Sequence, residues 1–406
     1  KAILYGLFFK LYFGFWNSRK VGPIVTSEDG NIYSMFLPPM PSQAHMRQME
    51  TILHNCFSWS TRKPMAVTIA ITRRCQLGCV HCSALRTGSS GPDLSREEIG
   101  RIINECIELG VTNITFTGGE PLLREDLEEL VSMVPPEKAV ALVFTNALAL
   151  DEKRAASLRK AGVKALFISL DTPDSTLHDE RRRRPGSFLA VRDGVKNAIR
   201  AGLPVCLSSY ATNESVRDGN LAKLADIGKE WGVAEISVFD VIPTGKLLCD
   251  DSILLTKENH MALRKQAFEL NQKNGGHPRI VTQSWTNSRS GMAVIVGCIA
   301  GHFQFHITAA GDLTPCDFTP LSFGNVRSDP VSEIWYRIVK HPAYQRHCYN
   351  CRMQTPSFRE KYIRPIPQGA SLPYPVDLVD GKAQSLNPAQ STCCGGNSTK
   401  GPFEKS

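Results

Sequence analysis

Three cysteines in the first quarter of the chain have a spacing suited to iron–sulfur chemistry. Cys75, Cys79 and Cys82 follow a C-x3-C-x2-C pattern, so one compact loop can point three thiolates inward. A four-iron cluster has four corners, so three protein ligands leave one iron open. A structural zinc ion needs a fourth protein ligand, and His81 is the candidate, although we expect its ring to face outward.

A second set of cysteines lies near the C-terminus. Cys298 and Cys316 flank a turn at Gly311, and Cys348 and Cys351 form a later C-x2-C pair. A hairpin turning at the glycine brings its two ends together, and the later pair can close the site. These four thiolates make a complete ligand set, which suits a fully protein-bound cluster.

The cysteine content also indicates the compartment. The chain has 13 cysteines and shows no convincing secretory signal, so metal or cluster ligation in a reducing compartment explains them better than disulfides do. We therefore expect a cytoplasmic protein. The adjacent pair Cys393 and Cys394 belongs to neither set, and its role stays open.

The elements that must position these cysteines alternate in type. From residue 66 onward, β-rich runs alternate with amphipathic helical segments, which predicts βα units around a parallel sheet. Six such units are too few for a closed eight-stranded barrel, so we expect an α/β fold with an open, partial (β/α)6 barrel. Ligands of such sheets gather at the carboxyl ends of the strands. The expected strands cover residues 66–71, 114–117, 140–144, 165–170, 205–208 and 235–239.

Polar and glycine residues follow three of these strands at the edge where ligands gather. The second strand ends in a Gly-Gly-Glu-Pro sequence, whose glycines allow a close backbone approach. Strand-end capping is an equally simple explanation for the polar residues. The candidates are Gly118, Gly119, Glu120, Pro121, Thr145, Asn146, Ser169 and Asp171.

We expect four regions along the chain. Residues 1–60 form an N-terminal extension with a hairpin and, over residues 2–16, an aromatic helix that either contacts a membrane interface or packs on the main domain. Residues 61–250 form the partial barrel, 251–354 a small α+β domain with the second cysteine set, and 355–406 a mostly extended tail rich in Pro, Ser and Gly.

Charge gives little indication of a macromolecular partner. The chain has 47 basic and 39 acidic residues, and residues 181–184 supply much of the excess. Such a run is usually a solvated loop, although it could also steer an anionic substrate. We expect no nucleic acid partner.

The first cysteine loop, followed one βα unit later by Gly-Gly-Glu-Pro, resembles the radical S-adenosylmethionine (SAM) superfamily. The second cysteine set resembles the shortened form of the SPASM domain, called twitch. The resemblance implies one SAM-binding 4Fe–4S cluster at Cys75, Cys79 and Cys82 and one auxiliary 4Fe–4S cluster at Cys298, Cys316, Cys348 and Cys351. It also implies that the polar strand-end residues contact SAM.

The resemblance implies an activity as well. One electron cleaves SAM to a 5'-deoxyadenosyl radical, which abstracts hydrogen from a peptide or protein side chain or from a haem-like cofactor precursor. A one-electron donor such as ferredoxin or flavodoxin would be needed. Two alternatives stay open, a non-catalytic iron–sulfur electron carrier and a radical enzyme for a lipid substrate. No catalytic residue is assigned.

Overall fold

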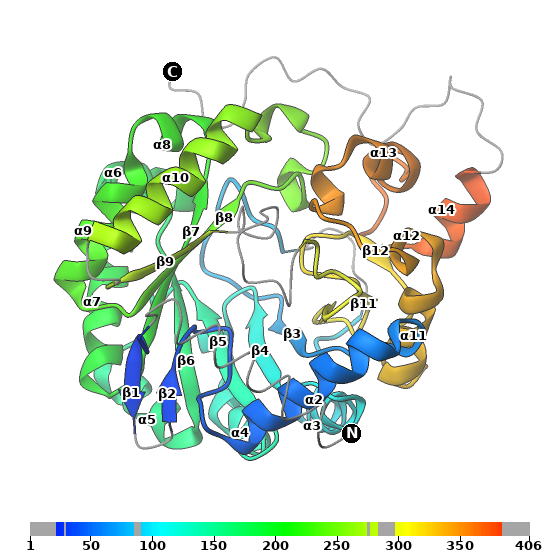
Figure 1. Ribbon diagram of the computed structural model, residues 1–406, viewed down its shortest axis with the longest axis horizontal. Coiled ribbons are helices and arrows are strands. Elements are labelled where there is room, and N and C mark those ends of the chain that lie inside the picture. Colours follow the sequence, from blue (N-terminus) through cyan, green and yellow to red (C-terminus); the bar gives the residue numbers. More distant parts are fainter. Residues whose placement is uncertain (1–21, 28–29, 85–90, 274–276, 283–296, 384–406) are drawn as a thin grey trace.

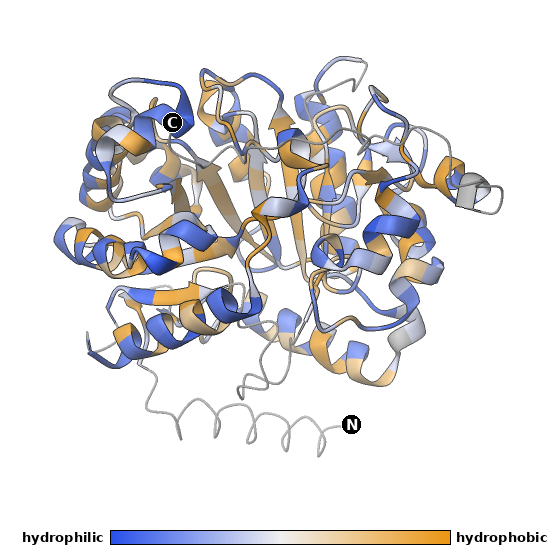
Figure 2. Ribbon diagram, turned by 90° about the horizontal axis from the view of Figure 1, so that it is seen from above, coloured by the Kyte–Doolittle hydropathy of each residue, from blue (hydrophilic) through white to orange (hydrophobic). Residues whose placement is uncertain are grey.

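The computed structural model describes residues 22–27, 30–84, 91–273, 277–282 and 297–383. A nine-stranded sheet runs through the molecule, with helices covering its outer face (Figure 1). Figure 2 shows mainly hydrophobic strands inside and helices whose outer surfaces are hydrophilic. This arrangement leaves the carboxyl ends of the strands together at one edge.

The six expected strands are confirmed, and they pair in chain order as a parallel sheet. They are β3 (Ala66–Thr72), β4 (Asn113–Gly118), β5 (Val140–Thr145), β6 (Val163–Ser169), β7 (Val205–Ala211) and β8 (Glu235–Asp240). The sheet is wider than predicted because further strands join both ends. β9 (Arg279–Thr282) pairs in parallel with β8, while β10 (Gln304–Ile307) pairs in parallel with β3 and carries antiparallel β11 (Leu313–Thr314).

The core lies between the sheet and its outer helices. Val67, Ile69 and Ile71 of β3 belong to this core, so the alternate residues of that strand face the barrel interior. The first outer helix begins with a capping box, in which Ser95 and Glu98 each bond to the other's backbone. The outer helices are α3 (Arg96–Leu109), α4 (Leu127–Ser132), α5 (Glu152–Ala161), α6 (Ser175–Arg182), α7 (Ser187–Arg200), α8 (Asn213–Arg217), α9 (Asn220–Trp231) and α10 (Lys257–Lys273).

The N-terminal segment closes the barrel at the end away from the cysteine loop. The predicted hairpin is present as β1 (Val25–Ser27) and β2 (Gly30–Ile32). Ile32 and Met35 pack against interior residues of β5 and β6, and α2 (Gln43–Phe57) follows. The aromatic helix expected over residues 2–16 lies outside the described residues. No helix in the described part of the chain is long and apolar enough to cross a membrane.

The expected boundary at residue 251 is wrong in the structure, because the next helix belongs to the barrel. α10 packs on α8, α9 and β9, and it buries Leu263 and Ala267. With β9 it extends the βα pattern by one unit. Long-range packing decides this placement, whereas the local sequence showed only a change of pattern.

The expectation of an extended tail is also wrong for residues 356–383. This segment forms α13 (Pro356–Phe358), a π-helix (Arg359–Ile363), β13 (Tyr374–Pro375) and α14 (Val376–Ala383). Phe358, Ile363 and Val379 are buried in the main core, and β13 pairs with β12 (Leu321–Ser322). Apolar residues spaced among the prolines therefore anchor the segment. Residues 384–406, including Cys393 and Cys394, lie outside the described residues.

The C-terminal region is anchored to the barrel through a buried tryptophan and a buried arginine. Trp335 of α11 (Val331–Lys340) donates from its indole Nε1 to the carbonyl oxygen of Arg62 at 2.9 Å. The Arg62 guanidinium donates to the carbonyl oxygens of Gly301 and Tyr344. Pro330 is the N-cap of α11.

Candidate functional site

The first cysteine loop, residues 75–82, leaves β3 at the carboxyl edge of the sheet. Cys79 is buried, Cys75 and Cys82 are partly exposed, and all three are free thiols. The last turn of α6 supports this loop, because the amides of Gly78 and Val80 donate to the carbonyl oxygens of Arg182 and Arg181 at 3.4 and 3.0 Å. The loop is thus fixed by backbone contacts from a helix about one hundred residues later in the chain.

The two motif glycines press against the chain that leads into this loop. Gly118 has a φ of 137°, and an added Cβ would lie 2.3 Å from the Thr72 oxygen. A Cβ on Gly119 would lie 2.1 Å from the Arg74 oxygen. The amides of Gly119 and Glu120 donate to these same two oxygens at 2.7 and 2.8 Å. Only glycine allows this approach, which ties the end of β4 to the start of the cysteine loop.

The Glu120 carboxylate lies inside the protein, where it joins the ends of β4 and β5. It accepts hydrogen bonds from the Thr145 hydroxyl at 2.6 Å and from the amides of Asn146 and Leu122 at 2.8 and 3.1 Å. Burial raises the pKa of Glu120, while these hydrogen bonds lower it. Three donors hold the carboxylate, so its first role is to shape this turn. Pro121 follows it as the first residue of a short buried 3-10 helix.

Asn146 brings the end of β5 to the first cysteine. Its side-chain Nδ2 lies 3.9 Å from the Cys75 sulfur, and its Oδ1 accepts from Gln76 at 3.4 Å and from the Leu148 amide at 3.0 Å. Asn146 is 5% exposed. The structure therefore brings together the cysteine loop, the glycine motif and the Thr145–Asn146 pair that the sequence analysis singled out separately.

Asp171 takes part in an ion pair instead of lying open at the strand end. Its carboxylate forms a bidentate pair with the Arg182 guanidinium, whose other nitrogen lies 3.7 Å from the Cys79 sulfur. Burial alone would raise the pKa of Asp171, but the Arg182 charge holds it below its usual value. Ser169, at the end of β6, is partly exposed and pairs in register with Ser208 of β7.

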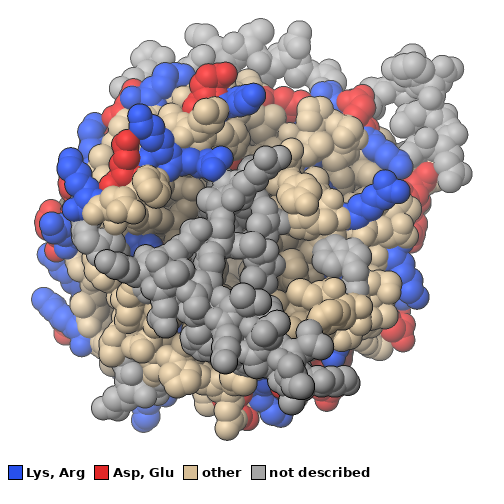
Figure 3. All heavy atoms as spheres, in the orientation of Figure 1, with Lys and Arg blue, Asp and Glu red and all other residues tan. Residues whose placement is uncertain are grey.

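Two expectations about this region need correction. The arginine run is a solvated loop only in its second half: Arg183 and Arg184 are exposed and follow α6, whereas Arg181 and Arg182 are 6% and 8% exposed within the helix. Across the face shown in Figure 3, the visible basic and acidic side chains lie interspersed around the rim. His81 does not face outward: its Nε2 lies 3.6 Å from Asp171 and its ring packs on Tyr210 at 4.3 Å between centroids. Burial lowers the pKa of His81 to about 4.

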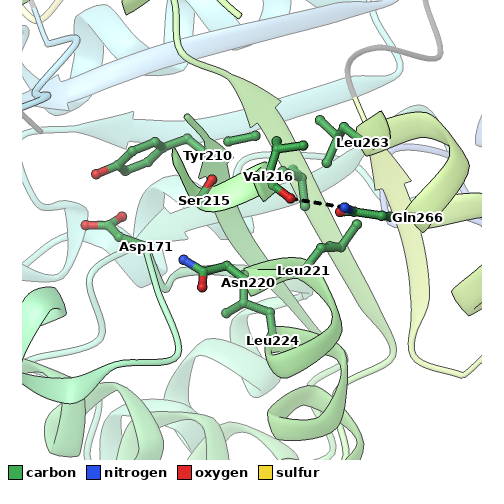
Figure 4. Close-up of a pocket in the computed structure, with 11 residues that line it drawn as sticks. Asp171, Tyr210, Ser215, Val216, Asn220, Leu221, Leu224, Leu263 and Gln266 are labelled. Carbon is green, nitrogen blue, oxygen red and sulfur yellow. Dashed lines mark hydrogen bonds between the residues drawn. The ribbon is translucent and has the colours of Figure 1, made fainter. Parts of the chain in front are cut away.

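A partly open pocket lies beside Asp171, between β7, β8 and the helices α8 to α10. Asp171, Tyr210 and Ser215 contribute polar groups on one side, while Leu224 and Leu263 contribute apolar side chains (Figure 4). Gln266 also lines the pocket, and its Nε2 donates to the Val216 carbonyl at 3.1 Å. The pocket thus places the Asp171 carboxylate, which pairs with Arg182, beside apolar side chains of α9 and α10.

The second cysteine set also gathers in space. The Cys298 amide donates to the Cys348 carbonyl at 2.7 Å, and Gly297, with a φ of 100°, allows this approach. Burial, together with nearby Cys298, raises the pKa of Cys316 to about 12. Cys351 has its pKa raised by burial and by the same two cysteines. All four are free thiols, and all four are partly exposed.

An acid–histidine pair on the interior side of the sheet was not predicted from the sequence. His306 of β10 lies opposite Thr68 of β3, and its Nδ1 is 2.8 Å from the Thr68 hydroxyl and 3.3 Å from the Asp317 carboxylate. Gln304 donates to the other carboxylate oxygen at 2.8 Å. Asp317 directly follows Cys316, and this adjacency was the one signal in the sequence.

The residues fit the clusters by their chemistry. In both sets the thiols are free, most are partly accessible, and they lie on loops whose backbone is held by hydrogen bonds. Arg182 near Cys79 and Asn146 near Cys75 supply positive charge and a donor to sulfur, which favour bound thiolates. In the described part of the chain, no three His, Cys, Asp or Glu side chains lie close enough together to hold a single metal ion, so the fit rests on the chemistry and placement of the thiols.

Comparison with known proteins agrees with this geometry. Residues 69–225 match the model of the radical SAM superfamily, and residues 298–352 match that of an iron–sulfur cluster-binding domain, SPASM. An AdoMet-dependent heme synthase from Methanosarcina barkeri is 24% identical over 340 residues, covering 76% of this chain and 96% of its own. A PqqA peptide cyclase from Granulibacter bethesdensis is 28% identical, covering 70% and 76%.

Solved structures share the fold. The crystal structure of Streptococcus suis SuiB bound to S-adenosylmethionine matches with a TM-score of 0.55 at 20% identity, over 70% of this chain and 67% of that one. The two family models match the regions that carry the two cysteine sets. The chain belongs to the radical SAM superfamily, as an enzyme with a SPASM-type C-terminal domain whose cofactors are S-adenosylmethionine and 4Fe–4S clusters.

Proposed function

We propose that Cys75, Cys79 and Cys82 hold the SAM-binding 4Fe–4S cluster of this enzyme. The observation that carries the proposal is the position of the cysteine loop, which lies at the carboxyl edge of the sheet against the ends of β4 and β5. When bound, the cluster supplies the electron that cleaves S-adenosylmethionine to a 5'-deoxyadenosyl radical, which abstracts hydrogen from the substrate.

The strand-end residues divide into two kinds of support for SAM. The hydrogen bond between Glu120 and Thr145 joins the turn after β4 to the end of β5, and Asp171 orients Arg182. We therefore propose that these three residues act mainly by shaping the site. The remaining residues offer backbone or side-chain groups directly. We propose Gly118, Gly119, Pro121, Asn146 and Ser169 for this second kind of contact.

For the C-terminal region we propose one auxiliary 4Fe–4S cluster, held by Cys298, Cys316, Cys348 and Cys351. The proposal is supported by the hydrogen bond that joins the Cys298 and Cys348 backbones and by the proximity of Cys298, Cys316 and Cys351. A cluster with four protein ligands suits electron transfer, here to or from the substrate side of the barrel.

For the substrate we propose a haem-like cofactor precursor. The similarity to a heme synthase that spans 96% of that protein supports this choice, as does 26% identity to an Fe-coproporphyrin III synthase from the same archaeon. A peptide side chain is the second candidate, supported by the similarity to the PqqA peptide cyclase. Either substrate would have to bind inside the barrel, near the two cysteine sets.

The test is anaerobic reconstitution with iron and sulfide, reduction by dithionite, and chromatographic detection of 5'-deoxyadenosine. We expect the wild type to produce it and the triple variant Cys75→Ala, Cys79→Ala, Cys82→Ala to produce none. A matched control replaces Cys56 and Cys249, which are exposed and belong to neither set, and it should retain production. If the wild type binds both clusters but forms no 5'-deoxyadenosine, the proposal is wrong.

The substrate is tested in the same assay. Addition of an iron coproporphyrin should increase 5'-deoxyadenosine formation and change the porphyrin mass, whereas unrelated peptides should do neither. The opposite pattern, with a peptide from the same genomic neighbourhood as the effective addition, would favour the second candidate.

We also propose two partners. A ferredoxin or flavodoxin would supply the electron in place of dithionite, and replacing dithionite by such a carrier with its reductase tests this. Residues 2–16 would contact a membrane surface peripherally. Co-sedimentation of the full chain with liposomes, compared with a protein lacking residues 1–18, tests this second partner, and equal binding by both would contradict it.

A further inference from the structure

The segment that leaves β8 touches both cysteine sites. Residues 244–246 begin four residues after the end of β8 and enter a 3-10 helix, Gly245–Leu247. The Thr244 hydroxyl is buried and donates to the Phe318 carbonyl at 2.8 Å. Phe318 lies two residues after Cys316, and its ring also packs on Phe239 of β8. One end of this segment is therefore fixed to the second cysteine site.

The other end of the segment is fixed to the first cysteine loop. Gly245 has a φ of 54°, and an added Cβ would lie 2.2 Å from the Cys82 carbonyl oxygen. The Lys246 amide donates to this oxygen at 3.4 Å. The Lys246 ammonium donates to the carbonyl oxygens of Cys79 and Gly78 at 2.9 and 3.1 Å. A single lysine thus contacts three carbonyl groups of the loop.

Lys246 and α6 hold the same loop through different backbone groups. The helix accepts hydrogen bonds from the amides of Gly78 and Val80, whereas Lys246 donates to the carbonyls of Gly78 and Cys79. Both backbone groups of Gly78 are therefore engaged, its amide by α6 and its carbonyl by Lys246. A loop held in this way keeps the cysteine spacing with little loss of conformational entropy when ligands bind.

We propose that Lys246 is a positioning residue that fixes the first cysteine loop in its ligating conformation and that its charge eases reduction of the cluster held there. This inference rests on the assignment of Cys75, Cys79 and Cys82 to that cluster. A positive charge beside the ligands stabilises the reduced, more negative form, so its loss makes reduction harder. Through Thr244, the same segment ties this loop to the second cysteine site.

The test compares three substitutions in the full-length, reconstituted protein. Lys246→Met removes the charge but keeps the length of the stem, Lys246→Arg keeps the charge and donors, and Lys223→Met changes an exposed lysine of α9 as a control. Three quantities are measured: iron and sulfide per chain, the ratio of reduced to oxidised cluster by electron paramagnetic resonance at one fixed solution potential, and hydrogen exchange of residues 75–82 before reconstitution.

For Lys246→Met we expect faster hydrogen exchange in the loop and a ratio of reduced to oxidised cluster lowered by about threefold, as for one unit charge acting through a water-like medium at close range. Lys246→Arg should restore both values, and Lys223→Met should match the wild type. Because hydrogen exchange is read without a cluster, it reports on the loop separately from cluster content.

Two results would overturn the inference. If Lys246→Met exchanges at the wild-type rate and holds a cluster with the wild-type ratio, Lys246 does not position the loop. If Lys246→Arg shows the same lowered ratio of reduced to oxidised cluster as Lys246→Met, the positive charge does not ease reduction. A wild-type protein that binds no iron at Cys75, Cys79 and Cys82 would instead refute the proposed function, which distinguishes that failure from this one.

Discussion

The hydrogen bonds of Glu120 allow a quantitative prediction. In Glu120→Gln, an amide nitrogen must replace one carboxylate oxygen, and each oxygen now accepts at least one hydrogen bond. The less costly orientation places the NH2 group against the Asn146 amide, so two donors face each other in a buried site. An unsatisfied buried donor costs about 1–3 kcal/mol, and bonds to a charged acceptor are stronger than neutral ones. We expect the free energy of unfolding to fall by about 3 kcal/mol.

Thr145→Val tests the same network from the other side. The Thr145 hydroxyl donates to Glu120 and accepts from the Ala147 amide at 2.9 Å, so valine breaks both bonds at nearly equal volume. We expect a loss of about 2 kcal/mol. Because both substitutions break the same Thr145–Glu120 bond, the double variant should lose about 1 kcal/mol less than the two losses added together.

The assay is urea unfolding of the cluster-free protein, followed by far-ultraviolet circular dichroism. Thr145→Ser, which keeps the hydroxyl, should stay within about 1 kcal/mol of the wild type, and Glu137→Gln changes an exposed glutamate as a control. If Glu120→Gln changes stability by less than about 0.5 kcal/mol while still abolishing SAM binding, the reasoning is refuted. The carboxylate would then serve the cofactor directly.

Three further predictions concern other parts of the chain. Burial raises the pKa of Glu235 from 4.5 to about 7. As pH rises through this window, the unfolded chain loses a proton that the folded state keeps, so the free energy of unfolding falls. Glu235→Gln should therefore raise the melting temperature more at pH 8 than at pH 5 in thermal unfolding, and the reverse would contradict this. Gly119→Ala places a Cβ 2.1 Å from a backbone oxygen and should destabilise by about 3 kcal/mol in urea unfolding, unlike Gly381→Ala, where nothing lies within 4 Å. Trp335→Phe removes the donor to the Arg62 carbonyl and leaves a void, so we expect the free energy of unfolding to fall by about 2 kcal/mol. The measurement is the urea midpoint, and an unchanged midpoint would refute this.

The sequence predicted the parallel strands well because their evidence is local. Each strand is a short β-rich run next to a helical segment, and each observed strand lies within two or three residues of the expected one. The sequence also predicted that the motif residues lie near one another, because strand ends converge at one edge of a parallel sheet, and their contact with SAM stays a prediction. Their proximity to the cysteine loop followed from topology alone.

The features that the sequence did not reveal depend on contacts between residues that lie far apart in the chain. Arg182 looked solvated because its neighbours are arginines, and only the fold places it between Asp171 and Cys79. His81 looked outward-facing because the packing of Tyr210 against it arises from a strand about 130 residues later. The glycine pair was expected to make room for a ligand, yet the structure shows it pressed against residues 72–74. Each of these cases requires knowing which distant segment lies opposite.

The position of β10 next to β3 has a consequence for how this protein could be shortened or recombined. β10, which lies between Cys298 and Cys316 in the chain, is hydrogen-bonded along β3, the same strand that leads to Cys75. Removing the C-terminal region would strip one side of β3 and expose an unpaired, apolar strand edge, which invites self-association. The two halves are therefore not interchangeable modules, and a chimaera that exchanges cluster domains between relatives should carry its junction outside the shared sheet.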